Sequence, residues 1–551
     1  MPALPEQLTP LSILSGARLG AAEYYSPLLE SSDPILRIGA WCMLLDRGEL
    51  SDAQYPEVIA LASEFPSIRD RAYRYFLRFF EYDQATQIVN LPGSKTDEAL
   101  RRAMACELSG DSAGHAAALR DLFLATGRLE TLAELAGVED RIAGWRGALP
   151  VAVQMIVLNP HDPALALDLF HYVHESRQVE LLDALVALLE TNSLHPAATL
   201  LYSAASKLMK GNAGGCLKTL GALSEARIAR PDIAARLRSV AFLLTAEALE
   251  KMGDYRKAYA AYRDMKAISL GKPSGLEEFT DMVTQSAAIE IPTLPTDTRT
   301  NHFVMTGFPR SGTTLLENAL AVHPRIETFE EIPSGSSAHL YLDRVLPTLA
   351  PDDERAAIFL EARERYYREV ERRHRKATAD VLIDKMPIRS AEARFMVRLF
   401  PDKRYIFSIR HPYDVVLSCF KQRFSPNIAM DHFRTFETAA RLYDFTMEQW
   451  FSVFSLDAPN VKYVRYDQLV TEFEPTVAAI LEFLGVGWDD AVKGFAQAAT
   501  ERSARTPSYH KVRQGLGIGV QTAWRNYRFL YESDAARPLK KWVEFFGYHA
   551  E

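Results

Sequence analysis

Residues 11–288 carry apolar side chains at intervals of three and four positions, and the breaks in this pattern fall at Gly, Pro, Asn or Asp. Such spacing puts the apolar residues on one face of a helix, and those four residue types commonly end helices. The pattern therefore predicts one helix after another. Two of the breaks are alike, Gly211 with Asn212 and Gly253 with Asp254.

The turn at Gly253 is similar to that of a tetratricopeptide (TPR) hairpin, in which a glycine closes the first helix. Ala258 and Tyr262 would then face that helix. Gly211 and Gly253 are farther apart than the roughly 34 residues of a standard repeat, so the repeats are degenerate or carry an insertion. We predict a TPR-like α-solenoid over residues 1–288, and a non-repeating helical domain is the alternative.

The spacing of apolar residues changes after a linker at residues 289–301. The linker holds two prolines and four threonines without helical spacing. Beyond it, short β-rich runs alternate with helical stretches. This alternation is typical of an α/β domain with a parallel sheet, which we expect over residues 302–551. The expected strands are His302–Gly307, Val381–Asp384, Tyr405–Ile409 and Val461–Tyr466.

Composition adds limits rather than a function. The 551 residues are 48% hydrophobic and 24% charged with a net charge of -8, which gives no reason to expect nucleic-acid binding. The four cysteines never form a C-x-x-C pattern, so neither a zinc site nor a disulfide framework is indicated. The start lacks the features of a signal peptide, and the longest apolar run, at 149–158, is too short to cross a bilayer. We expect a cytoplasmic protein without membrane insertion.

The segment from Gly307 to Gly312 is the most informative in the chain. It follows an expected strand and precedes a helix that begins at Thr313, and its glycine spacing is that of a phosphate-binding loop. The unpaired N–H groups of a helix start attract anionic oxygens. Thr313 stands where a nucleoside-triphosphate-binding loop has lysine, which argues against such a substrate. The spacing predicts a site for a 5′-phosphate with some other attached group.

Other polar residues follow the expected strands. Lys385 comes at the end of one strand, and Arg410 ends the next and precedes a helix carrying Ser418. Glu330 and Glu331 lie in a segment that we expect to be a loop after the first helix. Taken singly, a lysine at a strand end or a Glu-Glu pair in a loop is more often solvated surface charge. Ligands of parallel sheets bind at the carboxyl ends of the strands, so we expect these residues to form one site.

These motifs resemble those of PAPS-dependent sulfotransferases (PAPS is 3′-phosphoadenosine 5′-phosphosulfate). Residues 309–315 are similar to the family's 5′-phosphosulfate loop, and residues 407–418 to its 3′-phosphate motif. The order of motifs, including His323-Pro324 and residues 466–470, is most similar to tyrosylprotein sulfotransferases and bacterial TPR-fused sulfotransferases. The resemblance covers about residues 301–547.

The resemblance implies PAPS as co-substrate, with no metal. It assigns Glu331 as general base, with Glu330 as the alternative, and Lys385 and Arg310 as cations for the leaving oxygen. Ser508 would face the sulfuryl group. The implied donor-binding residues are Arg310, Ser311, Gly312, Thr313, Thr314, Arg410, Ser418, Lys511, Arg513 and Trp524. Residues 515–520, with three glycines, depart from the family's pattern and suggest a mobile lid.

Histidine is the alternative type of base. We interpret His323 and His411 as structural, and His339 as a weaker candidate than the glutamates. The acceptor implied by the resemblance is a protein tyrosine, bound by the helical repeats, and polysaccharide or small-molecule hydroxyls stay open, as does a homo-oligomer. Two other functions are the alternatives: a phosphoryl-transfer enzyme, for which only Asp384 resembles a magnesium ligand, and a non-catalytic TPR scaffold.

Overall fold

The computed structural model describes residues 26–32, 34–48, 50–91, 95–192, 194–225, 230–269, 277–348, 355–424, 427–495 and 523–548. The chain forms two compact units: residues 1–135 with 335–348, and residues 136–334 with 349–551. The domain boundaries expected at 288 and 302 both fall within the second unit, and they stay a prediction.

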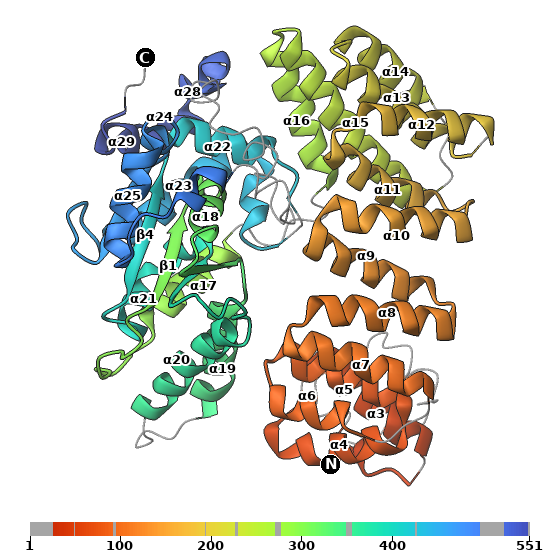
Figure 1. Ribbon diagram of the computed structural model, residues 1–551, viewed down its shortest axis with the longest axis vertical. Helices are drawn as coiled ribbons and strands as arrows, with labels where there is room; N and C mark the ends of the chain where they lie inside the picture. Colours follow the sequence, from red (N-terminus) through yellow and green to blue (C-terminus); the bar gives the residue numbers. More distant parts are fainter. Residues whose placement is uncertain are drawn as a thin grey trace. The chain divides into compact units, whose positions relative to one another are not determined.

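The first unit is helical where it is described (Figure 1). Its core gathers large side chains such as Trp41, Tyr73 and Phe76. Arg344, from the segment 335–348, donates hydrogen bonds to Tyr55 Oη at 2.7 Å and Glu81 Oε1 at 2.6 Å, which ties that segment to the early helices. The elements are α2 (Ser26–Leu29), α3 (Pro34–Arg47), η2 (Asp52–Gln54), α4 (Tyr55–Glu64), α5 (Pro66–Arg78), α6 (Tyr82–Val89), α7 (Lys95–Ser109), α8 (Ser112–Thr126), α19 (Ser334–Val345) and η3 (Leu346–Thr348).

The second unit begins with more helices. Helix α9 (Leu129–Ala143) crosses the boundary between the units. Its successors pack through a shared core that includes Phe170, Tyr202 and Leu237. They are α10 (Trp145–Leu158), α11 (Pro163–Ser176), α12 (Val179–Thr191), α13 (Pro196–Met209), α14 (Ala213–Glu225), α15 (Pro231–Lys251), α16 (Tyr255–Ser269) and α17 (Glu278–Ala288).

The two glycine turns seen in the sequence have the same structure. Gly211 has φ +82° and Gly253 has φ +78°, a left-handed conformation that glycine adopts without strain. After each, the next N–H donates back into the preceding helix, Asn212 to Lys207 and Asp254 to Leu249, both at 2.9 Å. Ala258 and Tyr262 are buried as expected. The helical hairpins are confirmed, and their membership of the TPR class stays a prediction.

A five-stranded parallel sheet follows, in the order β2-β3-β1-β4-β5. The strands are β1 (His302–Gly307), β2 (Ile326–Glu330), β3 (Val381–Lys385), β4 (Arg404–Ile409) and β5 (Val461–Arg465). Figure 1 shows β1 and β4 side by side. After β1, the chain adds β2 and β3 on one side of β1. It then adds β4 and β5 on the other side. Ligand sites of parallel sheets lie at such a reversal, which here is the carboxyl end of β1.

Successive side chains of a strand point to opposite faces of the sheet. Apolar residues occupy both sets of positions, and helices cover both faces. Ile406 packs in a core with α18 (Thr313–Ala321), α24 (Tyr466–Thr471) and α25 (Phe473–Leu484). Its neighbours Tyr405 and Phe407 instead contact Trp450 of α23 (Phe436–Phe451), with ring centroids 5.5 and 4.4 Å apart. The remaining elements are α20 (Arg355–Glu371), η4 (Pro387–Glu392), α21 (Ala393–Leu399), α22 (Pro412–Lys421), η5 (Met430–Arg434), η6 (Asp490–Gly494), η8 (Ala523–Tyr527), α28 (Arg528–Tyr531), η9 (Asp534–Ala536) and α29 (Arg537–Phe545).

The expected α/β architecture and four of the strands are confirmed. The expected loop at Glu330 and Glu331 was wrong in part, because Ile326–Glu330 forms β2, at the edge of the sheet. Three positions of this short strand, Glu327, Thr328 and Glu330, are polar and only half-buried, so its sequence lacks the continuous apolar run that marked the others. Among the described helices, none is long and apolar enough to cross a membrane.

Candidate active site

The loop after β1 depends on two glycines. A side chain at Gly307, where φ is +155°, would come within 2.7 Å of the carbonyl oxygen of Ser408. A side chain at Gly312, where φ is +108°, would lie 2.5 Å from the ring of Tyr466. Both positions therefore require glycine, for space as well as for backbone conformation. The loop leads directly into α18, as expected from the sequence.

The start of α18 offers donors at this loop. Gly312 is the residue that precedes the helix, and Thr313 and Thr314 open it, each buried. Ser311 is 1% exposed, and its Oγ has no hydrogen-bond partner among the described residues. A buried hydroxyl without a partner costs free energy, so it indicates a place for a ligand atom or a water. The loop thus combines a helix N-terminus with a spare donor, which suits an anion.

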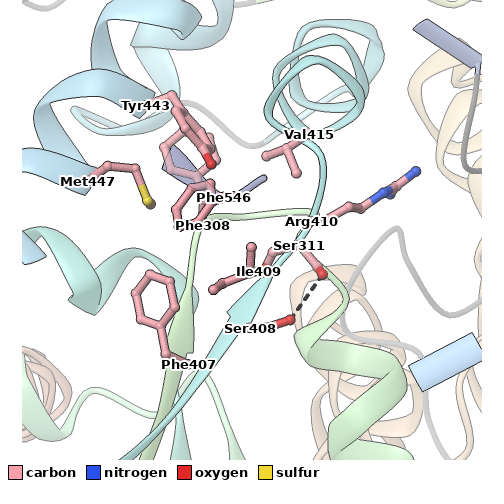
Figure 2. A pocket seen from close by; sticks show the side chains of 10 residues that line it. All are labelled: Phe308, Ser311, Phe407, Ser408, Ile409, Arg410, Val415, Tyr443, Met447 and Phe546. Atoms are coloured by element: carbon pink, nitrogen blue, oxygen red, sulfur yellow. Dashed lines mark hydrogen bonds between the residues drawn. The ribbon is translucent and has the colours of Figure 1, made fainter. Parts of the chain in front are cut away.

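A small pocket lies beside the loop, between the carboxyl ends of β1 and β4 (Figure 2). Aromatic and apolar side chains, including Phe308, Tyr443 and Met447, form most of its lining. Ser408 Oγ donates to the carbonyl oxygen of Ser311 at 3.0 Å, and this bond ties β4 to the loop. In Figure 2 the guanidinium of Arg410 points away from the aromatic residues. The apolar side chains of the pocket therefore support the loop, and the polar atoms of the lining lie at the edge of the pocket.

Arg310, Arg410 and Ser418 form one cluster, which we call the arginine cluster. Arg310 Nε donates to Ser418 Oγ at 3.1 Å, and Arg410 Nη1 donates to the carbonyl oxygen of Arg310 at 3.3 Å. The Arg410 guanidinium also lies over the ring of Tyr466, 4.7 Å from its centroid. Burial is the main reason that the pKa of Arg310 is lowered to about 10. The positive charge of Arg410 also lowers this pKa, whereas Cys419 and Tyr466 act in the opposite direction. The charge of Arg410 disfavours the charge of Arg310, so an anion beside both arginines would be stabilised.

Lys385 is the centre of a second cluster, the lysine cluster. Its side chain is 0% exposed, and Nζ lies 3.2 Å from Glu317, 3.3 Å from Glu330 and 3.0 Å from Glu331. Burial by itself would lower the pKa of this lysine, but the three carboxylates outweigh burial and raise it. Lys385 is therefore a fixed cation. Its position follows from sheet register, since Glu330 on β2 lies opposite Lys385 on β3.

The three carboxylates differ in access. The side chains of Glu317 and Glu330 are 4% and 10% exposed, whereas that of Glu331 is 40% exposed. Among the described residues of 302–548, Arg310 and Glu331 are the two non-glycine residues with positive φ, at +72° and +51°. Such conformations cost of order 1–3 kcal/mol and concentrate at functional sites. The strain therefore falls on one candidate residue in each cluster.

Glu317 was missed by the sequence reasoning. It lies in α18, whose nine residues are all buried. The available signal was a charged residue among the apolar residues Leu315, Leu316, Ala319 and Leu320, because a buried charge requires a partner. Lys385 is that partner, and the two residues meet only through the packing of α18 on the sheet.

The structure also shows where the three histidines and Asp384 lie. His323 Nε2 lies 3.0 Å from the carbonyl oxygen of Gly487, and His411 Nδ1 accepts from the N–H of Tyr413 at 3.2 Å, so both histidines serve the fold as interpreted. His339 lies on α19, in the first unit. The carboxylate of Asp384 accepts hydrogen bonds from Ser334 at 2.6 Å and Tyr366 at 2.5 Å, which is a structural role.

The candidates near the C-terminus are mostly outside the described residues: Ser508, Lys511, Arg513 and the glycine-rich segment 515–520. Trp524 is described and is 3% exposed. Its ring stacks on His411 with centroids 5.0 Å apart, and the backbone N–H of Trp524 donates to Asp414 Oδ1 at 3.3 Å. Trp524 thus packs against the start of α22. Its predicted contact with a nucleotide stays a prediction.

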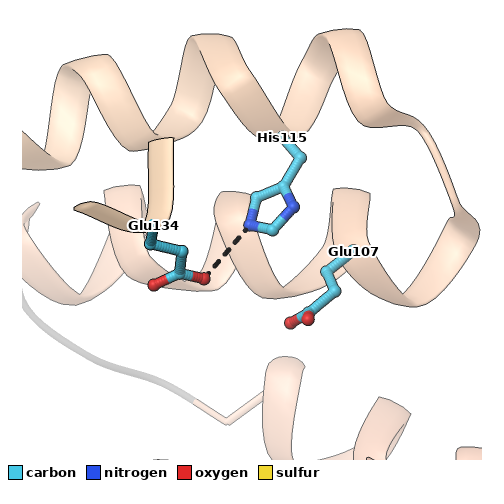
Figure 3. A group of neighbouring side chains, drawn as sticks. All are labelled: Glu107, His115 and Glu134. Atoms are coloured by element: carbon cyan, nitrogen blue, oxygen red, sulfur yellow. Dashed lines mark ion pairs between the residues drawn. The ribbon is translucent and has the colours of Figure 1, made fainter. Parts of the chain in front are cut away.

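A separate group of possible metal ligands lies in the first unit. Glu107, His115 and Glu134 come from α7, α8 and α9, with ligand atoms within 4.8 Å of one another (Figure 3). Tyr73 Oη donates to Glu107 at 3.1 Å, and His115 Nε2 is 3.6 Å from Glu134. Burial would lower the pKa of Arg74, but nearby carboxylates raise it. Asp70 contributes most to this rise, and Glu134 and Glu107 contribute less. These charges already face a cation, and we assign no metal here.

One family model matches part of the chain. Residues 303–490 match the model described as "Sulfotransferase family". Residues 303–490 form a sulfotransferase domain. That span contains the glycine loop at residues 307–312, the arginine cluster and the lysine cluster.

Two curated relatives match this chain at low identity. An uncharacterized protein of Aquifex aeolicus is 25% identical over 319 residues, 54% of this chain and 41% of that protein. Protein-tyrosine sulfotransferase 2 of Gallus gallus is 26% identical over 193 residues, 34% of this chain and 51% of the relative. The chain therefore spans about half or less of the length of these relatives.

Two solved structures are similar to part of this chain. The sulfotransferase domain of the Synechococcus PCC 7002 olefin synthase has a TM-score of 0.33 at 19% identity, covering 48% of this chain and 100% of that chain. Sulfotransferase STF9 from Mycobacterium avium has a TM-score of 0.30 at 13% identity, covering 60% and 96%. Since both TM-scores are low, the family assignment rests on the sequence match.

Proposed function

We propose that this protein transfers a sulfuryl group from PAPS to an acceptor hydroxyl. One observation carries the proposal: the arginine cluster lies beside a glycine loop that has Thr313 in place of a lysine. The loop and the cluster provide two separate anion sites. A donor with a 5′-phosphosulfate and a distant 3′-phosphate needs two such sites, whereas a nucleoside triphosphate needs one continuous cradle with a lysine.

The described residues fit such a donor. Ser311, with its buried and unpartnered Oγ, and the first N–H groups of α18 would hold the 5′-phosphosulfate. Arg410 and Ser418 would hold the 3′-phosphate, and the planar guanidinium of Arg410 can meet two oxygens at once. The donor supplies the sulfuryl group that is transferred.

The lysine cluster supplies the chemistry of transfer in this proposal. The acceptor oxygen forms a bond to sulfur while the bond from sulfur to the 5′-phosphate oxygen breaks, and adenosine 3′,5′-bisphosphate leaves. Glu331 would take the acceptor proton, since it is the most exposed carboxylate at Lys385. Lys385, which stays protonated, would stabilise negative charge on the leaving oxygen. Glu330 is too enclosed to serve as well.

For the acceptor we propose a tyrosine in a protein. The support is the likeness to protein-tyrosine sulfotransferase 2 of Gallus gallus and the preceding helical hairpins, a class of structure that often binds extended peptides. Polysaccharide and small-molecule hydroxyls are the alternatives.

A transfer assay tests the proposal. Purified full-length protein is incubated with sulfur-labelled PAPS and a panel of tyrosine peptides, phenols and polysaccharides, and both labelled product and released bisphosphate are measured. The proposal predicts equal amounts of the two with at least one acceptor, and their loss in Glu331→Gln. Phosphoryl transfer from ATP-Mg²⁺ to the same panel, with no transfer from PAPS, would overturn it.

A further inference from the structure

One turn of α22, residues 418–421, has contacts on two sides. On one side it meets the glycine loop: Ser418 Oγ accepts from Arg310 Nε at 3.1 Å, and Cys419 Sγ donates to the carbonyl oxygen of Pro309 at 3.3 Å. On the other side it meets α15 and α16, the last hairpin before the sheet. All of these elements belong to the second compact unit.

The contact with α16 is made by a buried lysine. Lys266 is 1% exposed. Its Nζ donates to the carbonyl oxygen of Gln422 at 2.5 Å and, at 3.5 Å, to that of Cys419. These carbonyls belong to the C-terminal end of α22, where the last four C=O groups lack partners within the helix and carry partial negative charge. Lys266 therefore caps α22 with both donors and positive charge.

No carboxylate among the described residues pairs with Lys266. The charged groups that face it are Arg423 and Arg434, both cations, and its ammonium lies 5.6 Å from the ring centroid of Phe424. A buried lysine normally has an acidic partner, because burial of an unpaired charge is costly. The end of α22 takes the place of that partner here.

A second set of contacts joins the same hairpin to the same turn. Lys421, the last residue of α22, lies 2.5 Å from Glu250 of α15. Glu250 also accepts hydrogen bonds from Tyr262, at 3.1 Å, and from Tyr527. Phe420 packs in the core formed by Tyr262 and its neighbours. The helical hairpin thus contacts every residue from Cys419 to Gln422.

We propose that Lys266 is a positioning residue for the 3′-phosphate half of the donor site. The inference rests on the proposed function. By fixing the C-terminal turn of α22, Lys266 fixes Ser418 against Arg310, and so sets the spacing between the 3′-phosphate groups and the loop. The last helical hairpin is then part of the donor site and not only a module for binding the acceptor.

Two ligands separate positioning from general stability. Adenosine 3′,5′-bisphosphate uses the 3′-phosphate groups, whereas adenosine 5′-phosphosulfate lacks a 3′-phosphate and uses only the loop. Affinities of both are measured by calorimetry on the full chain. Lys266→Met removes the cap and nearly preserves side-chain volume. We expect it to weaken bisphosphate binding about tenfold and to change phosphosulfate binding less than twofold.

Three further variants make the test specific. Lys257→Met is the matched control, since Lys257 lies on the same helix with a side chain that is 75% exposed. It should leave both affinities unchanged. Lys266→Arg keeps donors and charge and should restore binding to within about threefold of the natural protein. Glu250→Gln weakens the second contact and should lower bisphosphate affinity selectively, by about threefold; it carries the test if Lys266→Met does not fold.

The outcomes are distinguishable. If the natural protein binds bisphosphate no better than phosphosulfate, the proposed function fails, and this inference fails with it. If the natural protein prefers bisphosphate but Lys266→Met and Glu250→Gln leave that preference intact, only the inference is overturned. Equal weakening of both ligands also overturns it, because a merely structural lysine would act on the whole site. Selective loss of the 3′-phosphate preference supports it.

Discussion

Two buried lysines in the second unit have opposite surroundings. Lys385 is 0% exposed among three carboxylates, and Lys266 is 1% exposed against backbone carbonyls and two arginines. The pKa of Lys385 is raised because Glu317, Glu330 and Glu331 outweigh burial. The pKa of Lys266 is lowered to about 7, first by burial and then by Arg434 and Arg423. Equal burial thus gives a permanent cation at one site and a titrating one at the other.

The difference shows what each lysine does. A permanent cation beside an open carboxylate suits charge stabilisation during group transfer. A lysine held by carbonyl oxygens keeps its donors in either protonation state, which suits a helix cap. The chemistry and the support of the site are therefore served by the same residue type in different electrostatic settings.

The largest expected effect is on Lys385. Lys385→Met leaves two enclosed carboxylates, Glu317 and Glu330, without their cation, and removing one partner of a buried ion pair costs about 3–5 kcal/mol. Lys266→Met removes an unpaired cation and should cost no more than about 1 kcal/mol. Denaturant unfolding of both variants measures the contrast. Similar losses for the two would show that their surroundings do not differ as described.

The next effect concerns the open carboxylate of the lysine cluster. Glu331→Gln should lower kcat for sulfuryl transfer by about 100-fold or more, because a positioned general base contributes about 10²–10⁴. Bisphosphate affinity should stay within about twofold, since Glu331 belongs to the other cluster. Glu330→Gln is the matched control with a small effect. A larger loss of kcat in Glu330→Gln than in Glu331→Gln would mean that Glu330, and not Glu331, is the general base.

A pH series sharpens the comparison at Lys266. Its pKa is about 7 in the folded protein, and a free lysine has a pKa of about 10.4. Between these values the unfolded chain binds more protons, so the free energy of unfolding should rise with pH. We expect a rise of about 1–2 kcal/mol between about pH 7 and 9 that Lys266→Met removes. Parallel curves for the natural protein and the variant would refute the lowered pKa.

The smallest effect is expected at Glu317. Glu317→Gln removes one of three carboxylates around a single lysine, which relieves repulsion while it weakens attraction. Stability should therefore change by no more than about 1 kcal/mol. The same denaturant titration measures it. A loss as large as that of Lys385→Met would mean that Glu317 alone holds the lysine.

The sequence was sufficient for the loop, the parallel sheet and the residues at the strand ends, because glycine spacing and apolar runs are local signals. It was not sufficient for Glu317 or Lys266. Glu317 meets Lys385 through packing of α18 on the sheet, and Lys266 meets α22 more than 150 residues away. Strand β2 was missed since its half-buried positions hide its apolar pattern. Contacts across the fold leave no periodicity in the chain.

The most direct test of the account is a calorimetric titration of the full chain with adenosine 3′,5′-bisphosphate, set against ADP and ATP-Mg²⁺. We predict that the bisphosphate binds tightest and that Arg410→Ala weakens it by about 10- to 100-fold, the worth of charge-assisted hydrogen bonds to a phosphate. ADP binding should change little in that variant. Tightest binding of ATP-Mg²⁺, or a bisphosphate affinity indifferent to Arg410→Ala, would contradict a PAPS-type donor site.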